Sequence, residues 1–386
     1  MSEATPTGLS RRGFIRTSGL TFGALACTAA DTVSAAAPVE DPRAGLEQAR
    51  ATMTNVTRIT SPNGVQDLCK VSLGGADQWI SVRGRNRDNP VLLYVHGGPG
   101  APEMPLSWIF QSPWEDYFTV VQWDQRGAGK SFSAEPADRI GPTMSADQIV
   151  ADGAELIAYL RKRFGGRKII VLGQSWGSYV GLRMAMARAE DIAAYVGTGQ
   201  AINFLEAEKI GYDWVLGQAR TANNFAAVRE LEAIAPYPNI DGDVPLAKLD
   251  VQRKWSVHYG GLHFGRSAYD YYWASARLSP DYTPEDVVNI GRGSQLSLKH
   301  LLDDLVRADL NGIRSVPFPV IMMLGRRDFT TPSILAERWL KRLKAPRKKL
   351  VWFEASAHLV PIEEPGRFLV ELVDNVLPFA HGARGR

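Results

Sequence analysis

The sequence has too few cysteines and histidines for a metal cluster or a disulfide framework. Its 386 residues include two cysteines, Cys27 and Cys69, and six scattered histidines. Metal sites and disulfide-stabilised folds need closely spaced sets of these residues. If Cys27 is removed with an N-terminal segment, Cys69 has no partner for an intramolecular disulfide. We therefore expect a fold that depends on neither disulfides nor a bound metal.

The sequence also lacks an excess of charge of one sign. Its 44 basic and 41 acidic residues give a net charge of +3, too small for a strong field toward nucleic acid or an anionic membrane. There is no internal repeat or low-complexity tract. A hydrophobic fraction of 45% is ordinary for a globular enzyme with one large core and an inserted subdomain. No nucleic-acid partner is expected.

The N-terminus lacks an apolar run long enough for a stable membrane anchor, but it has the features of an export signal. Paired Arg11 and Arg12 precede a short apolar stretch rich in Gly, Thr and Ala, and small residues follow it. This pattern resembles a twin-arginine signal peptide over residues 1–37. We expect an exported protein, periplasmic or secreted. The alternatives are a basic tail, or lipidation at Cys27.

The chain alternates between strand-like and helix-like patterns. Apolar runs such as "PVLLYVHGG" and "KIIVLGQS" indicate strands buried on both faces of a parallel sheet. Amphipathic stretches between them, one of which Ser145 can cap, indicate helices. This alternation predicts an α/β fold with a mostly parallel central sheet and helices on both faces. It stops at an aromatic-rich, helical interval, so we expect a core in two parts (44–202 and 312–386) and an inserted helical cap (203–311).

The stretch "VLGQSWGSYVGL" places a serine at the junction between a strand and a helix. A serine hydroxyl becomes an effective nucleophile when a neighbouring base removes its proton. In Gly173-Gln174-Ser175-Trp176-Gly177, the glycines leave room for the sharp turn that exposes such a hydroxyl at the top of a parallel sheet. We interpret Ser175 as a nucleophile. The alternative is that Ser175 only caps the helix and that the glycines serve packing.

A base and an acid are expected at the carboxyl ends of later strands. His358 follows the strand "KKLVWFE" and Asp328 follows the strand "PVIMMLG", so both should emerge at the sheet edge where α/β sites form. Their order after Ser175 suits a Ser-Asp-His triad. The other histidines beyond Ser175 lie in the expected cap or the C-terminal tail. Glu354 is an alternative acid, but it is close to His358 in sequence.

Two backbone N–H groups are predicted to bind the oxyanion of an acyl-transfer reaction. One belongs to Trp176, directly after the nucleophile, and the other to Gly98 in "HGGPG", which we prefer to Gly97. The glycines of this loop allow its backbone to face the reacting carbonyl. The indole of Trp176 is expected to form a wall of the pocket.

Five segments carry a family resemblance. They are "HGGPG" (96–100), "QWDQRGAGKS" (122–131), "GQSWGS" (173–178), "GRRDFTTP" (325–332) and "SAHLVPIEEP" (356–365). With them the chain resembles the proline iminopeptidase-like branch of the α/β-hydrolase superfamily, over roughly residues 60–200 and 312–380. The resemblance implies a helical cap over the site and hydrolysis through an acyl-enzyme without a cofactor.

The cap sequence departs from the pattern of these peptidases. The resemblance implies cap glutamates that hold the substrate's free α-ammonium, one of them in a Trp-x-x-Trp-Glu-like motif. The nearest stretch, "KWSVHYGG", has Tyr259 at the position of that glutamate. A neutral tyrosine cannot hold an ammonium as a buried carboxylate does. Four other cap glutamates remain as candidates, although their spacing is typical of solvent-facing helix positions: Glu206, Glu208, Glu230 and Glu232.

The cap is dense in aromatic residues, which suits a mostly apolar pocket. We expect Trp214, Trp255, His258 and Tyr259 to bind substrate. The sequence therefore predicts an exported serine hydrolase that cleaves an ester, lactone or amide of a hydrophobic small molecule. One alternative is a proline iminopeptidase-type aminopeptidase that acts on short peptides. Another is a ligand-binding protein on a hydrolase scaffold, which would form no acyl-enzyme. The oligomeric state stays open.

Overall fold

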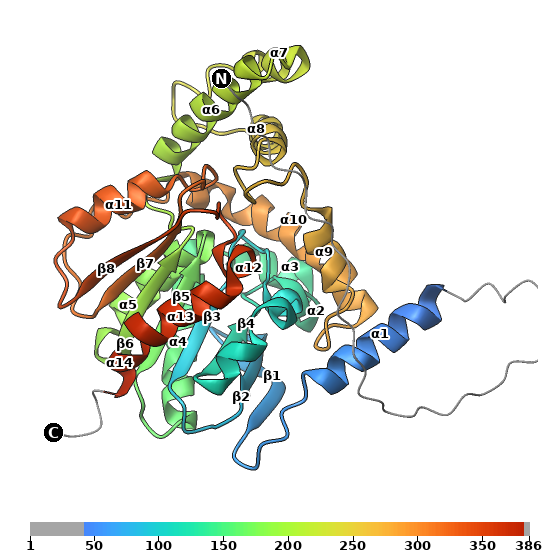
Figure 1. Ribbon diagram of the computed structural model, residues 1–386, viewed down its shortest axis with the longest axis vertical. Coiled ribbons are helices and arrows are strands. Elements are labelled where there is room, and N and C mark those ends of the chain that lie inside the picture. The colour runs from blue at the N-terminus through green and yellow to red at the C-terminus, as the bar shows by residue number, and fades with distance from the viewer. Residues whose placement is uncertain (1–41, 382–386) are drawn as a thin grey trace, which may run out of the picture. The chain divides into compact units, whose positions relative to one another are not determined.

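The central sheet is assembled from the strands that the apolar runs predict (Figure 1). The computed structural model describes residues 42–381, so the predicted signal peptide, residues 1–37, lies outside the described residues. Within the described part, the strands are β1 (Val65–Leu73), β2 (Ala76–Gly84), β3 (Val91–Val95), β4 (Thr119–Trp123), β5 (Ile169–Gln174), β6 (Ile192–Thr198), β7 (Val320–Gly325) and β8 (Lys348–Phe353).

The strands form one sheet in the order β1-β2-β4-β3-β5-β6-β7-β8. β1 and β2 form an antiparallel hairpin, and β2 pairs antiparallel with β4. All pairs from β4 to β8 are parallel. The predicted α/β fold with a mostly parallel sheet is therefore confirmed. Because these strands run in one direction, the loops that follow β3, β5, β7 and β8 meet at a single edge of the sheet.

Helices surround the sheet and continue into an insertion. They are α1 (Pro42–Val56), α2 (Gly129–Ala134), α3 (Ala137–Ile140), α4 (Ala146–Arg163), α5 (Trp176–Ala187), α6 (Phe204–Thr221), α7 (Phe225–Ala233), α8 (Leu246–His258), α9 (Asp270–Ala276), α10 (Pro284–Val306), α11 (Ser333–Arg342), α12 (Val360–Glu363), α13 (Pro365–Asn375) and α14 (Leu377–His381). Ser145 caps α4 as predicted, accepting the Gln148 N–H at 3.1 Å. No described helix combines the length and the hydropathy that a bilayer-spanning segment needs.

Apolar layers cover both faces of the sheet. In β3, Leu93 belongs to the layer that includes residues of α4, α5 and α11, whereas Leu92 and Tyr94 belong to the layer that includes residues of α13. Successive side chains of a strand point to opposite faces, so a strand covered on both sides reads as a continuous apolar run. The apolar layers on both faces therefore hold the strands in place. The loops at the carboxyl ends of the strands can then carry the side chains of a site.

The helices α6 to α10 lie between β6 and β7, in the interval where the sequence predicts a cap. Residues of α6, α7 and α8 form a separate apolar cluster around Val215, Leu231 and Trp255. Helix α10 packs against α2 of the core, and the buried Lys130–Asp286 ion pair, 2.7 Å long, joins the two helices. The insertion therefore has its own small core and is also fastened to the sheet domain.

Candidate active site

Ser175 lies in the strained turn between β5 and α5. Its backbone has φ 54° and ψ −127°, a region that residues with a side chain rarely adopt and that costs about 1–3 kcal/mol. The flanking glycines are required by contact: a Cβ on Gly173 would lie 2.5 Å from the Gly177 carbonyl oxygen, and one on Gly177 would overlap the Val95 carbonyl oxygen. The turn therefore keeps the Ser175 side chain clear of both neighbouring elements.

Asp328 and His358 meet across the loops that follow β7 and β8. His358 Nδ1 lies 2.9 Å from Asp328 Oδ2. Because a carboxylate only accepts, the imidazole proton belongs on Nδ1, which leaves Nε2 with a free lone pair. The other Asp328 oxygen accepts the Thr330 and Thr331 N–H groups at 2.9 and 2.8 Å. Glu354, the alternative acid, is exposed and pairs with Arg326 instead.

The backbone around His358 is fixed from two sides. Glu363 accepts the N–H groups of the residues flanking the histidine, Ala357 at 3.0 Å and Leu359 at 2.8 Å. The His358 N–H donates to the Leu262 carbonyl oxygen of the cap at 3.0 Å. Sequence reasoning missed Glu363, although it stands within the "SAHLVPIEEP" segment. Its half-buried carboxyl binds the backbone of the histidine loop, and no hydrogen bond joins it to the ring in the described structure.

The same stretch of the cap also contacts the loop of Asp328. The Gly261 carbonyl oxygen accepts the Phe329 N–H at 3.3 Å and the Thr330 hydroxyl at 3.2 Å. Together with the bond from His358 to Leu262, these contacts join residues 261–262 of the cap to both loops that present the acid and the base.

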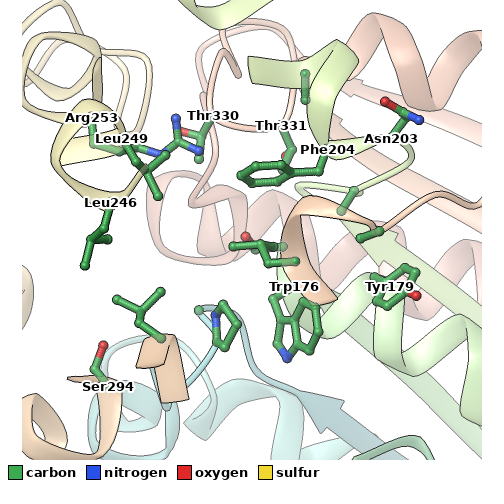
Figure 2. A pocket seen from close by; sticks show the side chains of 18 of the residues that line it. Trp176, Tyr179, Asn203, Phe204, Leu246, Leu249, Arg253, Ser294, Thr330 and Thr331 are labelled. Atoms are coloured by element: carbon green, nitrogen blue, oxygen red, sulfur yellow. The ribbon is translucent and has the colours of Figure 1, made fainter. Parts of the chain in front are cut away.

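Ser175 lines two adjoining cavities. One has a volume of about 300 Å³ and extends toward α6, α8 and α10; Figure 2 shows Arg253 reaching into it from α8. The other, of about 240 Å³, also contains His358. Among the described residues, the Ser175 hydroxyl has no hydrogen-bond partner. A hydroxyl can turn about χ1, and catalytic hydrogen bonds are often formed only when substrate is bound.

Gly98 and Trp176 line the larger cavity together with Ser175. In the described structure, neither backbone N–H has an acceptor, so both remain available to a ligand. A Cβ at Gly97 would lie 3.1 Å from the Ser175 Cβ, so a side chain there would crowd the nucleophile. The loop is held by His96, whose Nε2 accepts the Gln125 N–H at 3.1 Å. Burial lowers the pKa of His96 to about 4, so its ring stays neutral and structural.

The cap residues predicted to bind substrate do not line either cavity. Trp255 packs in the apolar cluster of the cap, and its indole N–H donates to Glu230 at 2.9 Å. His258 and Tyr259 pack edge to face beside it. Trp214 stacks on Phe329, with ring centroids 4.1 Å apart. Trp214, Trp255 and Tyr259 pack in or against the apolar cluster because a cap of a few helices needs large side chains for its own core, whereas His258 is exposed.

Other residues of the cap form the cavity walls. Tyr269, Tyr272 and Trp273 line the smaller cavity, and Arg253 lines both. The guanidinium of Arg253 forms an ion pair with Glu208, which is 1% exposed. The other candidate glutamates also pair with cations on the surface: Glu206 with Arg338, Glu230 with Lys254, and Glu232 with Arg220. None of the four glutamates lines either cavity.

A carboxyl that sequence reasoning missed does line the smaller cavity. Glu103 directly precedes a short 3₁₀ helix, Met104–Ile109, and is 3% exposed. Burial raises the pKa of Glu103 to about 8; the hydrogen bond from Gly97 N–H lowers it, and the charge of Asp124 adds to the rise. In sequence, a glutamate among the prolines of "GPGAPEMPL" has no signal of burial. Within residues 42–381, no group of three or more His, Cys, Asp or Glu side chains converges as metal ligands do.

Comparisons with known proteins agree with this arrangement. The family model described as the alpha/beta hydrolase fold matches residues 90–365, so the chain belongs to the α/β-hydrolase fold family. It is therefore a hydrolase of this fold. Within the family, it belongs to the proline iminopeptidase-like branch, as its relatives show.

Two curated relatives cover most of their own length. A probable aminopeptidase of Bacillus subtilis is 27% identical over 80% of this chain and 96% of its own. A proline iminopeptidase of Neisseria meningitidis serogroup B is 34% identical over 76% of this chain and 90% of its own. Among solved structures, a proline iminopeptidase-related protein of Thermus thermophilus has a TM-score of 0.56 at 21% identity, covering 82% of this chain and 99% of its own. At that identity the structure supports the fold alone.

Proposed function

We propose that the protein is a serine aminopeptidase that releases the N-terminal residue from short peptides or aminoacyl amides. The observation that carries the chemistry is the Asp328–His358 hydrogen bond beside a cavity that both His358 and Ser175 line. The names of the relatives support the peptide substrate. They favour the aminopeptidase over the hydrolase of hydrophobic esters, lactones or amides that the sequence predicts first.

In this mechanism Ser175 Oγ attacks the carbonyl of the N-terminal residue and its proton passes to His358 Nε2. Asp328 holds the imidazole in the required tautomer and stabilises the imidazolium. The N–H groups of Gly98 and Trp176 donate to the oxyanion. His358 then protonates the leaving amine, and afterwards it removes a proton from the water that hydrolyses the acyl-enzyme. The steps use three side chains of this chain, two of its backbone N–H groups and one water molecule.

A substrate panel tests the peptidase proposal. Prolyl, alanyl and leucyl arylamides with a free amine are compared with their N-acetyl forms, aryl esters and lactones, using protein that lacks residues 1–37. An aminopeptidase cleaves the free-amine arylamides and loses that activity when the amine is acetylated. Equal turnover of acetylated and free substrates, or turnover of esters and lactones alone, would favour the first sequence prediction.

Fluorophosphonate labelling tests the nucleophile separately. The wild-type protein should be labelled at Ser175, and the variant Ser175→Ala should not be labelled. Absence of label on the wild-type protein would contradict the nucleophile and would favour a ligand-binding role on the hydrolase scaffold.

We also propose that residues 1–37 direct export through the twin-arginine route. The support is the paired Arg11 and Arg12 ahead of a short apolar stretch. Cell fractionation of wild-type protein and of the double variant Arg11→Lys, Arg12→Lys tests this. Loss of the exported fraction in the double variant alone is expected, and export of both proteins would contradict the proposal.

A further inference from the structure

Glu103 is a buried carboxyl beside the nucleophile with one oxygen unused. Its Oε2 accepts the Gly97 N–H at 3.3 Å. In the described structure no other residue donates a hydrogen bond to its Oε1, and Glu103 lines the same cavity as Ser175 and His358. Buried polar atoms normally have a partner, and a buried charge normally has a counter-charge. A carboxyl without a counter-charge at the wall of a reaction cavity therefore indicates a positively charged group that a ligand brings.

The carboxyl and the nucleophile are close together. The Cβ position of Gly97 lies 3.6 Å from Glu103 Oε1 and 3.1 Å from Ser175 Cβ, so these two atoms are at most 6.7 Å apart, the sum of both distances. In an amino acid, the amine nitrogen lies about 2.5 Å from the carbonyl carbon. A hydrogen bond of about 2.8 Å to the carboxyl and an attack distance of about 3 Å complete the path from Oε1 to the serine hydroxyl. The available span accommodates an α-amino acyl group.

The surroundings of Glu103 leave it without a cation of its own. Tyr94 and Tyr272 face it from β3 and α9, and Asp124 is the nearby anion. Arg253, which lines the same cavity, is already paired with Glu208. A positively charged ligand group would therefore be the first counter-charge for this carboxyl.

We propose that Glu103 binds the α-ammonium of the substrate's N-terminal residue, whose side chain occupies the cavity of about 240 Å³ beside Tyr269, Tyr272 and Trp273. This inference rests on the proposed aminopeptidase function. It places the anchor on the core loop after "HGGPG" and not on a cap glutamate. Because the carboxyl forms a wall of the cavity, an acylated amine would meet it without a positive charge to pair with it.

A second carboxylate provides the matched control. Asp250 on α8 lines the larger cavity, but it is exposed to solvent. Each carboxylate is replaced by its amide, Glu103→Gln and Asp250→Asn. The glutamine keeps an acceptor for the Gly97 N–H and so preserves the loop contact, while it removes the negative charge.

The experiment measures kcat/KM for two arylamides that differ only in the amine: prolyl-aminomethylcoumarin and cyclopentanecarbonyl-aminomethylcoumarin. We expect Glu103→Gln to lower the ratio of the first to the second by about 100-fold, as for the loss of one charge-assisted hydrogen bond. Asp250→Asn should leave the ratio within about threefold. Below about pH 8, where the substrate's α-amine is still protonated, the ratio in the wild-type protein should also rise with pH as the Glu103 carboxyl ionises, and this rise should be absent from Glu103→Gln.

The outcomes separate the anchor from the proposed function. A wild-type protein with no preference for the free amine would overturn both proposals. A preference that Glu103→Gln leaves unchanged, or that Asp250→Asn removes, would overturn the anchor alone. An equal loss on both substrates in Glu103→Gln would mean that Glu103 only positions the oxyanion loop, and it would also overturn the anchor.

Discussion

The variant Glu103→Gln can be tested through stability as well as through activity. Burial raises the pKa of Glu103 from an ordinary 4.5 to about 8. Between these values the unfolded chain releases the proton while the folded protein retains it, so the free energy of unfolding falls as pH rises through this window. At 1.36 kcal/mol per pH unit, ionisation of the buried carboxyl costs the fold about 5 kcal/mol at pH well above 8.

Glutamine carries no proton equilibrium in this range. The free energy of unfolding of Glu103→Gln relative to wild type should therefore increase by about 3.5 kcal/mol between pH 5 and pH 8. For a chain of this size, this corresponds to on the order of 5 °C in the difference between the two melting temperatures. Urea unfolding followed by tryptophan fluorescence at both pH values measures the effect. Asp250→Asn, an exposed substitution, is the control and should show no comparable pH dependence.

The result that would refute this reasoning is a difference in stability that stays the same at pH 5 and pH 8. In that case the Glu103 carboxyl would titrate normally and would be an ordinary loop residue. A stability gain at alkaline pH together with a loss of selectivity for the free amine is the pattern expected of a group kept for binding at a cost to the fold. The other charged and polar groups around Glu103 are the same in both proteins, so their effects cancel in the difference: Tyr94, Asp124, Arg253, Tyr272 and His358.

Three further substitutions test the site and its support. Ser175→Gly should abolish turnover yet raise the free energy of unfolding by about 1–2 kcal/mol, because glycine adopts the strained turn without penalty; equal or lower stability by urea unfolding would contradict the strain. Asp328→Asn should lower kcat by about 10⁴-fold through the wrong imidazole tautomer, and a loss below tenfold in steady-state assays would argue against its role. Asp286→Ala should lower the free energy of unfolding by about 3–5 kcal/mol because it leaves Lys130 buried without a partner. Asp213→Ala, on the surface, should lower it by less than about 1 kcal/mol. Similar losses for both variants in thermal unfolding would contradict this reasoning.

Much of the core could be predicted from the sequence because its signals are local. The strand–serine–helix junction places Ser175 by the steric demands of a single turn, and the apolar runs "PVLLYVHGG" and "KIIVLGQS" contain β3 and β5. Asp328 and His358 could be located because each follows a buried strand, and parallel strands bring their ends to one edge. These predictions needed only the order of the chain and the periodicity of apolar residues.

The lining of the cavities could not be predicted in the same way. Helix α8 carries Trp255 toward the cap interior, Arg253 toward the site and His258 toward solvent, and its sequence has no clear apolar stripe that distinguishes these sides. Which side faces the site is decided by how α6 and α7 pack on it. Glu103 was missed for a related reason. Tyr272, one of the residues that face it, belongs to the cap and is distant in sequence, so the loop's own residues give no sign of the burial.

Three hydrogen bonds join Gly261 and Leu262 to the loops of Asp328 and His358. They limit the routes by which substrate can enter and product can leave the site. If the cap moved away at residues 261–262, the hydrogen bond from the His358 N–H to Leu262 would break. The imidazole would then be less firmly held during proton transfer. Under the proposed mechanism, substrate therefore enters and product leaves past other parts of the insertion. Loss of these three hydrogen bonds would lower turnover by releasing the loops that carry Asp328 and His358, even if Ser175 kept its position.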